Sequence, residues 1–383
     1  MLTYKFRLYP TETQEVMLNG ALEACRYVYN YFVRNNYRTR NDMNYALTEL
    51  KEQKPWLYDY HAKMLQMVST QIAGARKALR ELKKKGYQTG ALKFKKYGEF
   101  DTCIYNQSGF DIDTSDPTLY LSGIGKIKMK IHRSITATIK QITLKRKAGR
   151  WYACITTDSN RMFPSILRPI DFTNSVGIDV GIKNYAYDSD NNVTPNPANI
   201  RRMLKPLARV NRKLSRRVEG SQNYKKAVRW YQCIHERIVN RRKDFLHKLS
   251  TQYVSKYDVI FLERLRLTSM VKNHSLAMSI MDAAWSTFKK MVAYKAKLML
   301  EVESRNSTID CSRCHNKVPK TLAVRIHVCD RCGLILDRDY NASLNILQRG
   351  LKMLGVPQEL REFTPVETLT VSRKQEAHAV RRG

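Results

Sequence analysis

The chain has 383 residues, with 68 Lys and Arg against 34 Asp and Glu, so its formal net charge is +34. Hydrophobic residues make up 43% of it, enough for folded cores, which excludes a wholly disordered basic tail. Self-repulsion on this scale is best offset by a polyanion, so we expect RNA or DNA as a partner rather than a charge that serves only solubility. The sequence contains no run of about 18 apolar residues and no N-terminal secretion pattern, so we expect a cytoplasmic protein without a membrane span.

The N-terminus predicts a strand followed by a helix. Apolar residues alternate from Leu2 to Leu8 and stop at Pro10, which is typical of a strand. Thr11 and Gln14 form a predicted capping box for the helix, whose apolar positions recur with a 3.6-residue period. The end of this helix mixes tyrosines with arginines, which suits either stacked bases and phosphates or a tyrosine-rich core edge with a solvated basic face. These residues are Tyr27, Tyr31, Tyr37, Arg26, Arg34, Arg38 and Arg40.

A second helix is predicted over about residues 61–85, because its apolar positions recur on one face and it ends in lysines and Gly86. After it, apolar residues alternate with lysines over 124–131. Residues 136–147 and 150–157 resemble a hairpin around Ala148-Gly149. The pattern predicts an antiparallel sheet with a lysine-rich face, and helices inserted between its first strand and the others.

The second half of the chain alternates buried-type strands with helices. Residues 201–243 hold fifteen Lys and Arg against two acids on helical spacing, and we expect helix to continue to Lys256. We expect the last thirty or so residues to be mobile. The other expected elements are strands at 175–181, 184–190 and 259–263, an amphipathic helix over 285–300, and a short helix over 339–354.

Two CxxC pairs predict a structural zinc site. Fourteen residues separate Cys311-Ser-Arg-Cys314 from Cys329-Asp-Arg-Cys332, and two such knuckles can present four thiolates to Zn²⁺. His315 and His327 flank the pairs and are the alternative ligands. A pair of redox motifs is disfavoured, because neither pair follows a thioredoxin-like βαβ pattern. Structural zinc sites are closed, so we expect this one to stiffen a loop and to catalyse nothing itself.

Three acids are candidates for a second metal site. Asp179 and Glu263 lie on buried-type strands, where an unpaired carboxylate is costly, and Asp339 begins a helix. Oxygen ligands suit Mg²⁺ or Mn²⁺, and two such ions can promote hydrolysis of a phosphodiester. Taken singly, Asp339 fits an N-cap and Glu263 fits a salt-bridge partner. Together, in so basic a chain, the three acids favour a nuclease.

The motifs GIDVGIKNYAYDSD, FLERL, CSRC…CDRCG and DRDYNASLNIL occur in this order. Together with the opening YKFRLYPTETQ and LKFKK at 92–96, they resemble the TnpB family of transposon-associated, RNA-guided DNA endonucleases. By this resemblance Asp179, Glu263 and Asp339 match the catalytic acids of a RuvC-like site with two Mg²⁺ or Mn²⁺ ions. Asp337 is the neighbour or cap, and the four cysteines match the family's zinc-binding insertion.

The resemblance implies an α+β multidomain fold. It has a wedge-like N-terminal β-barrel with an inserted helical recognition bundle, then an RNase H-like (RuvC) α/β domain with an inserted zinc ribbon. The expected boundaries are 1–10 and 90–168 for the barrel, 11–89 for the helical insertion, 169–306 and 334–355 for the nuclease domain, 307–333 for the zinc insertion, and 356–383 for a disordered tail.

The implied partners are a guide RNA from the transposon end (omega RNA) and double-stranded target DNA, bound by a monomeric ribonucleoprotein that reads a short flanking motif. The alternatives are a nuclease-inactive, RNA-guided DNA-binding regulator and a guide-free, structure-selective RuvC-like nuclease. We expect basic helices of 201–243 to line the channel for the RNA–DNA hybrid. The candidate nucleic-acid contacts are Gln66, Gln71, Lys93, Lys95, Arg212 and Arg216.

Overall fold

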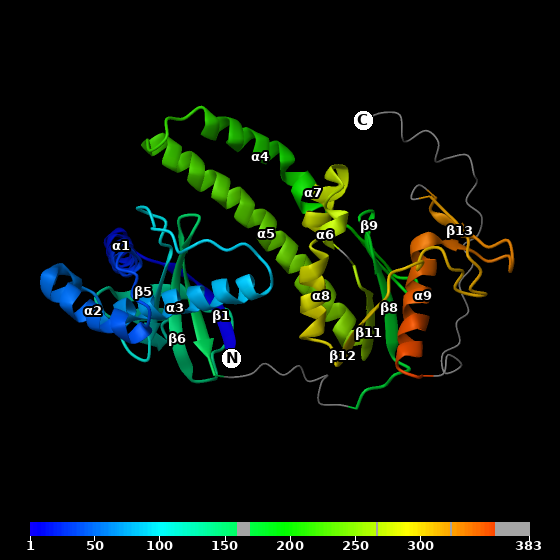
Figure 1. The fold of residues 1–383 in the computed structure, drawn as a ribbon, viewed down its shortest axis with the longest axis horizontal. Coiled ribbons are helices and arrows are strands. Elements are labelled where there is room, and N and C mark those ends of the chain that lie inside the picture. The colour runs from blue at the N-terminus through cyan, green and yellow to red at the C-terminus, as the bar shows by residue number, and fades with distance from the viewer. Residues whose placement is uncertain (159–168, 266, 322–323, 357–383) are drawn as a thin grey trace. The chain divides into compact units, whose positions relative to one another are not determined.

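The computed structural model describes residues 1–158, 169–265, 267–321 and 324–356. The chain divides into two compact units, Met1–Arg161 and Met162–Gly383, which are described separately below (Figure 1). In these ranges no helix is both long and apolar enough to cross a membrane. The finer division into five parts stays a prediction, and all of the expected tail except Val356 lies outside the described residues.

The first unit contains a seven-stranded antiparallel sheet in the order β2-β6-β7-β1-β5-β4-β3. The prediction of a barrel is confirmed in part. The strands form a half-barrel sheet, and its edge strands, β2 and β3, do not pair with each other. The hairpin between β6 and β7 turns at Ala148 and Gly149, which both have positive φ (50° and 67°), as a two-residue turn requires. The strands are β1 (Leu2–Tyr9), β2 (Thr102–Asn106), β3 (Phe110–Asp113), β4 (Thr118–Leu121), β5 (Gly125–Lys130), β6 (Ile139–Lys147) and β7 (Arg150–Thr157).

Helices lie between β1 and the rest of this sheet in the sequence, as the alternation of patterns predicted. They are α1 (Glu12–Arg34), α2 (Arg40–Gln53), the 3₁₀ turn η1 (Pro55–Asp59) and α3 (Ala62–Lys84). Thr11 and Gln14 make the predicted capping box of α1. The helices and the sheet share one core, to which β1 contributes Phe6 and Leu8 and β7 contributes Trp151. The large aromatic side chain of Trp151 is almost wholly removed from solvent there.

The tyrosines at the end of α1 belong to this core. Tyr31 and Tyr37 are half-buried against it, and their hydroxyl oxygens lie 3.4 Å apart. The rings of Tyr31, Phe32 and Tyr37 contact one another. The interpretation as a tyrosine-rich core edge is therefore correct for these rings, while Arg38 remains exposed.

The second unit contains a five-stranded mixed sheet in the order β10-β9-β8-β11-β12. Strands β8, β11 and β12 are parallel, β9 pairs antiparallel with β8, and β10 pairs antiparallel with β9. Parallel strands buried on both faces explain the nearly continuous apolar runs in the sequence. The strands are β8 (Ser175–Val180), β9 (Asn184–Asp188), β10 (Val193–Pro195), β11 (Val259–Glu263) and β12 (Leu298–Val302).

One sequence prediction in this unit is wrong. The helix expected over 285–300 is α8 (Trp285–Ala293), and residues 298–302 instead form β12. The backbone of β12 pairs in parallel with β11, with Val259 beside Leu298 and Glu263 beside Val302. A short apolar run fits a helix and a strand equally well, and here the hydrogen bonds of the sheet decide between them.

The remaining helices connect or cover the sheet. The long α4 (Asn199–Ser215) and α5 (Gln222–Lys256) carry the predicted run of basic residues, and α6 (Leu267–Met270) and α7 (His274–Ala283) follow β11. A two-stranded hairpin, β13 (Ile326–Val328) and β14 (Ile335–Asp337), leads directly into α9 (Arg338–Met353). Helix α9 packs against the sheet beside β8 (Figure 1).

The close packing of α9 on β8 depends on Gly177. A Cβ atom added there would lie within 3.0 Å of the Ser343 carbonyl oxygen and the Leu347 amide nitrogen, which are backbone atoms of α9. We therefore expect Gly177→Ala to push α9 away and to lower the free energy of unfolding by about 1–3 kcal/mol. Gly74→Ala on α3 is the matched control, because nothing lies within 4 Å of its added Cβ. Denaturant unfolding checks this, and equal stability of the two variants would contradict it.

Candidate catalytic and metal centres

The structure brings Asp179, Glu263 and Asp339 to one cleft. Asp179 lies near the end of β8 and Glu263 at the end of β11. These two strands are parallel neighbours, and Ile178 pairs with Leu262, so the next residue on each strand is an acid at the same sheet edge. Asp339 reaches the same place from the first turn of α9. All three carboxyl groups line a cleft of about 810 Å³.

The carboxyl groups influence one another electrostatically. Burial raises the pKa of Asp179 above its usual range, and the negative charges of Glu263 and Asp339 raise it further. Burial also raises the pKa of Glu263, although a hydrogen bond from Ser307 and the charge of Arg349 oppose this. A site in which carboxylates crowd together in this way favours an added cation, which would lower their pKa values.

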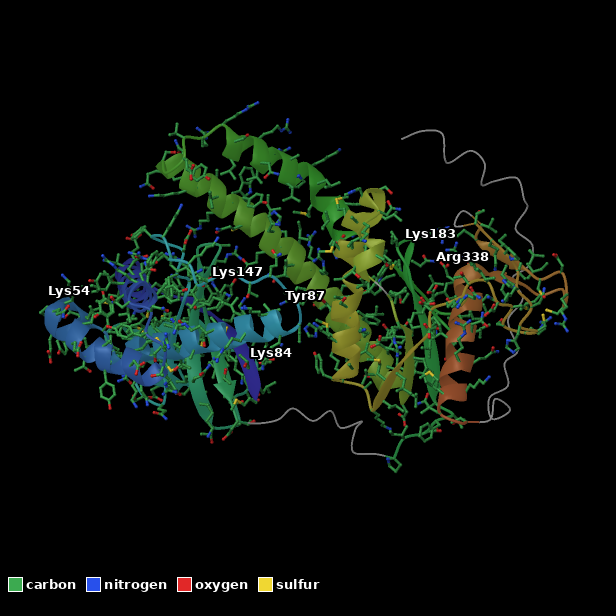
Figure 2. The ribbon with its side chains drawn as sticks, in the orientation of Figure 1. Lys54, Lys84, Tyr87, Lys147, Lys183 and Arg338 are labelled. Atoms are coloured by element: carbon green, nitrogen blue, oxygen red, sulfur yellow. The ribbon has the colours of Figure 1, made fainter. Side chains whose placement is uncertain are left out.

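Two arginines that the sequence did not single out flank Asp339. Arg338 donates to Asp339 Oδ1 from Nε at 3.1 Å and from Nη2 at 3.0 Å. Arg325 Nη1 lies 3.6 Å from Asp339 Oδ2. Both arginines and Lys183 line the cleft. Figure 2 shows Arg338 at the start of α9 and Lys183 after β8. Cations beside the acids make the cleft suitable for a phosphate group.

Asp337 has the capping role that the sequence analysis gave it. Its Oδ1 accepts hydrogen bonds from the backbone N–H of Asp339, at 2.7 Å, and from that of Tyr340, at 3.3 Å. Asp337 is therefore the N-cap of α9, and Asp339 is not. Because Asp337 caps the helix, the Asp339 carboxyl group is not used for capping and lines the cleft instead.

The loop before the first CxxC pair is held by the polar face of α9. Asn341 donates to the Asp310 carbonyl at 2.8 Å, and Asn345 donates to the Ser307 carbonyl at 2.8 Å. Arg349 Nη2 binds Asp310 Oδ2 at 2.8 Å. The Ser307 hydroxyl in turn donates to Glu263 Oε1. The loop therefore connects the cysteine cluster to one of the acids in the cleft.

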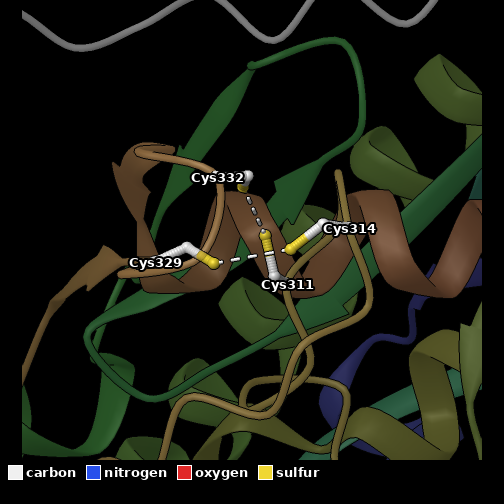
Figure 3. Close-up of side chains that lie close together, drawn as sticks. All are labelled: Cys311, Cys314, Cys329 and Cys332. Atoms are coloured by element: carbon white, nitrogen blue, oxygen red, sulfur yellow. Dashed lines mark hydrogen bonds between the residues drawn. The ribbon is translucent and has the colours of Figure 1, made fainter.

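The four cysteines converge as their spacing predicts. Their sulfur atoms all lie within 4.8 Å of one another, with Cys311 Sγ 3.6 Å from Cys332 Sγ and Cys314 Sγ 3.5 Å from Cys329 Sγ (Figure 3). Tetrahedral Zn²⁺ with Zn–S bonds of about 2.3 Å places its sulfur ligands about 3.8 Å apart, so the donor set fits the ion.

Neither flanking histidine joins the cysteine cluster among the described residues. His327 is buried, and its Nδ1 contacts the Lys320 ammonium group. Burial lowers the pKa of His327 to about 4, and the charge of Lys320 adds to this effect. His315 adopts a positive φ of 59° in the turn after Cys314, where its backbone N–H donates to the Cys311 carbonyl at 2.9 Å.

The predicted nucleic-acid contacts are divided between the two units. In the first unit, Gln66, Lys93 and Lys95 are exposed and Gln71 is half-buried on α3. The backbone carbonyl of Lys95 accepts a hydrogen bond from Asn30 at 2.9 Å. In the second unit, Arg212 and Arg216 are exposed at the end of α4. Their roles stay a prediction.

Three family models match parts of the chain. Residues 161–274 match one described as "Probable transposase". Residues 285–346, which include the cysteine cluster, match "Cas12f1-like, TNB domain", and residues 1–42 match "Helix-turn-helix domain".

Known proteins resemble the chain over most of its length. It is 31% identical to the "Putative RNA-guided DNA endonuclease" of Streptomyces pristinaespiralis, over 91% of this chain and 89% of that protein. It is 27% identical to the "Putative RNA-guided DNA endonuclease InsQ" of Escherichia coli K12, over 95% of this chain and 96% of that protein. Among solved structures, the Cas12f1 protein in a complex with sgRNA and target DNA has a similar fold. Its TM-score is 0.50 at 14% identity, over 87% of this chain and 83% of that one.

Proposed function

This chain belongs to the TnpB family of RNA-guided DNA endonucleases, and from that premise we propose that it cleaves DNA at a single RuvC-like site formed by Asp179, Glu263 and Asp339. The observation that carries the proposal is the convergence of these three acids, which are far apart in the sequence, on one cleft. The proposed reaction is hydrolysis of a phosphodiester in target DNA next to a short transposon-associated flanking motif.

The three acids would hold divalent metal ions. Asp179 and Glu263 offer carboxylate oxygens from adjacent strand ends, and Asp339 offers its own from α9. When bound, two Mg²⁺ or Mn²⁺ ions supply activation of the attacking water and stabilisation of the leaving oxygen. Arg325 and Arg338 hold Asp339 in place and add positive charge where the DNA phosphate would lie.

The proposed division of labour assigns recognition of the target sequence to a guide RNA. RNA from the transposon end (omega RNA) would pair with one strand of double-stranded DNA, and the protein would read only the flanking motif. Exposed cations on α4 and α5 support the proposal that these helices hold the hybrid. The active species would be a monomeric ribonucleoprotein.

The test begins with the RNA that co-purifies with the protein. We expect one homogeneous species, which directs cleavage of a plasmid library with randomised flanks in Mg²⁺ or Mn²⁺ and not in EDTA. RNA-guided binding of DNA without cleavage in either Mg²⁺ or Mn²⁺ would overturn the assignment of the catalytic site. Cutting that does not depend on the RNA would instead favour a guide-free nuclease.

Ser307 gives a second prediction, because its hydroxyl orients Glu263. Removing a hydrogen-bond partner of a metal ligand typically costs about 10- to 100-fold in metal affinity or activity, and we expect Ser307→Ala to lower the cleavage rate within this range. Ser312→Ala in the same loop is the control, because the Ser312 hydroxyl has no hydrogen-bond partner among the described residues. Single-turnover cleavage at several Mg²⁺ concentrations measures both effects. An unchanged rate for Ser307→Ala would show that the hydrogen bond is unimportant.

A further inference from the structure

A cavity of about 620 Å³ opens on the first unit. Three segments form it: the end of α1 with the connection to α2, one face of α3, and the chain after α3. Its volume lies within the roughly 300–1,000 Å³ typical of sites for small ligands. The residues that line it include three arginines, Arg38, Arg76 and Arg80, and no acid.

Arg76 fixes the connection between α1 and α2. Its Nη1 donates to the carbonyl oxygen of Tyr37 and, at 3.4 Å, to that of Arg38. Asn36 adopts a positive φ of 51°, a conformation that Asn tolerates better than most residues, and it also lines the cavity. The connection is thus held by hydrogen bonds, so Arg38 extends from a fixed part of the backbone.

The other two arginines are available to a ligand. Arg80 lies one turn beyond Arg76 on the same face of α3, and both Arg38 and Arg80 are exposed. In the part of the chain that the structure describes, no carboxylate pairs with either of these guanidinium groups. Three neighbouring guanidinium groups without an acid repel one another, and a phosphate group would relieve that repulsion.

The cavity also has an apolar wall, which a phosphate alone would not use. Val33, Leu79 and Leu92 are half-buried and line it beside the arginines. The amide group of Asn36 offers both a donor and an acceptor to the edge of a base. Guanidinium groups next to apolar side chains fit a nucleotide, because the base can stack or pack while the phosphate is bound.

We propose that this cavity binds one unpaired nucleotide of the guide RNA. The proposal rests on the RNA partner of the proposed function but not on its catalytic site. RNA is favoured over DNA because loops and bulges of folded RNA extrude single bases, whereas the bases of a DNA duplex stay stacked and present only a regular backbone. The cavity accounts for the arginine at 38 that the sequence analysis set beside the core tyrosines.

The test compares two double variants on the same region. Arg38→Ala/Arg80→Ala removes the two available guanidinium groups and keeps Arg76, which holds the backbone. Lys77→Ala/Lys83→Ala is the matched control, because it removes two exposed cations of α3 that do not line the cavity. A third variant, Leu79→Gln, alters the apolar wall without changing the charge.

The probe is the RNA that co-purifies with the wild-type protein, transcribed in vitro and bound without target DNA or divalent metal. We expect the arginine variant to bind it about 10- to 100-fold more weakly. The salt dependence of log K should become shallower by about 0.7 for each RNA phosphate that the variant no longer neutralises. Chemical probing of the RNA should show the same one or two unpaired nucleotides becoming reactive in the arginine variant and in Leu79→Gln, but not in the control.

Three results would overturn the proposal. One is an unchanged RNA protection pattern in the arginine variant, and another is equal weakening by the lysine control. The third is a loss of affinity for duplex DNA alone, which would assign the cavity to DNA. Thermal melting of each variant shows whether the fold is retained. None of these measurements depends on cleavage. A negative result for the cavity can therefore be distinguished from a wrong assignment of the catalytic site.

Discussion

Asp179→Asn is expected to lower the rate of target DNA cleavage by about a thousandfold or more, while leaving the affinity for guide RNA unchanged. The substitution removes one negative charge from the three acids that line the cleft. Metal-ion catalysis supplies several kcal/mol of transition-state stabilisation, and each factor of ten in rate corresponds to about 1.4 kcal/mol. Single-turnover cleavage by the ribonucleoprotein and a separate RNA-binding assay measure the two quantities. Retained cleavage would remove Asp179 from the catalytic site.

The same variant has a predicted effect on stability that does not involve cleavage. The folded-state pKa of Asp179 is raised by burial and by Glu263 and Asp339, so its contribution to stability is full at low pH and is lost as pH rises through that raised value. Near neutral pH without metal, Asp179→Asn should therefore melt a few degrees above the wild type. Mg²⁺ should reverse this order, because it stabilises the wild-type site more. Melting curves in EDTA and in Mg²⁺, compared from pH 5 to 8, check the sign.

Disruption of the four-cysteine cluster should have the second large effect. Cys311→Ser/Cys329→Ser takes away two of four converging thiolates, so we expect the zinc content to fall from about one ion per chain to none and the melting temperature to drop. Cleavage should also fall by about 10- to 100-fold, because the loop that contains Ser307 loses an anchor close to Glu263.

A matched substitution separates this effect from the chemistry of cysteine itself. Cys154→Ser in β7 changes a free cysteine outside the cluster, and it should leave the zinc content and the cleavage rate unchanged. Metal analysis by mass spectrometry, thermal melting and cleavage would be measured for both proteins. Unchanged zinc in the double variant would contradict the assignment of the four ligands.

The positions of the acids were predictable because each signal is local. A lone acid in a short buried-type strand is conspicuous, and the parallel pairing of β8 and β11 brings Asp179 and Glu263 to the same edge. The cysteine spacing carried similar information about the metal cluster. The ordered motifs then placed the chain in a family, which composition and periodicity alone do not do.

What the sequence did not show depends on contacts between distant segments. Arg325 reaches Asp339 from the chain before β13, and Ser307 reaches Glu263 across the second unit. No local pattern marks either residue. The sequence analysis predicted helix for the residues of β12. Their extended conformation is determined by pairing with β11, which the periodicity of one segment does not reveal. The cavity lined by Arg38, Arg76 and Arg80 is likewise formed by three segments that are separate in the sequence.

The most direct test of the account is the number of divalent ions that the three acids hold. Mn²⁺ titrated into the ribonucleoprotein with bound target DNA can be followed by electron paramagnetic resonance. We predict two ions per chain with the magnetic coupling expected of ions about 3.5–4 Å apart, and loss of that coupled pair in Asp179→Asn. The same coupled signal in the variant and the wild type, or none in either, would contradict a shared metal site.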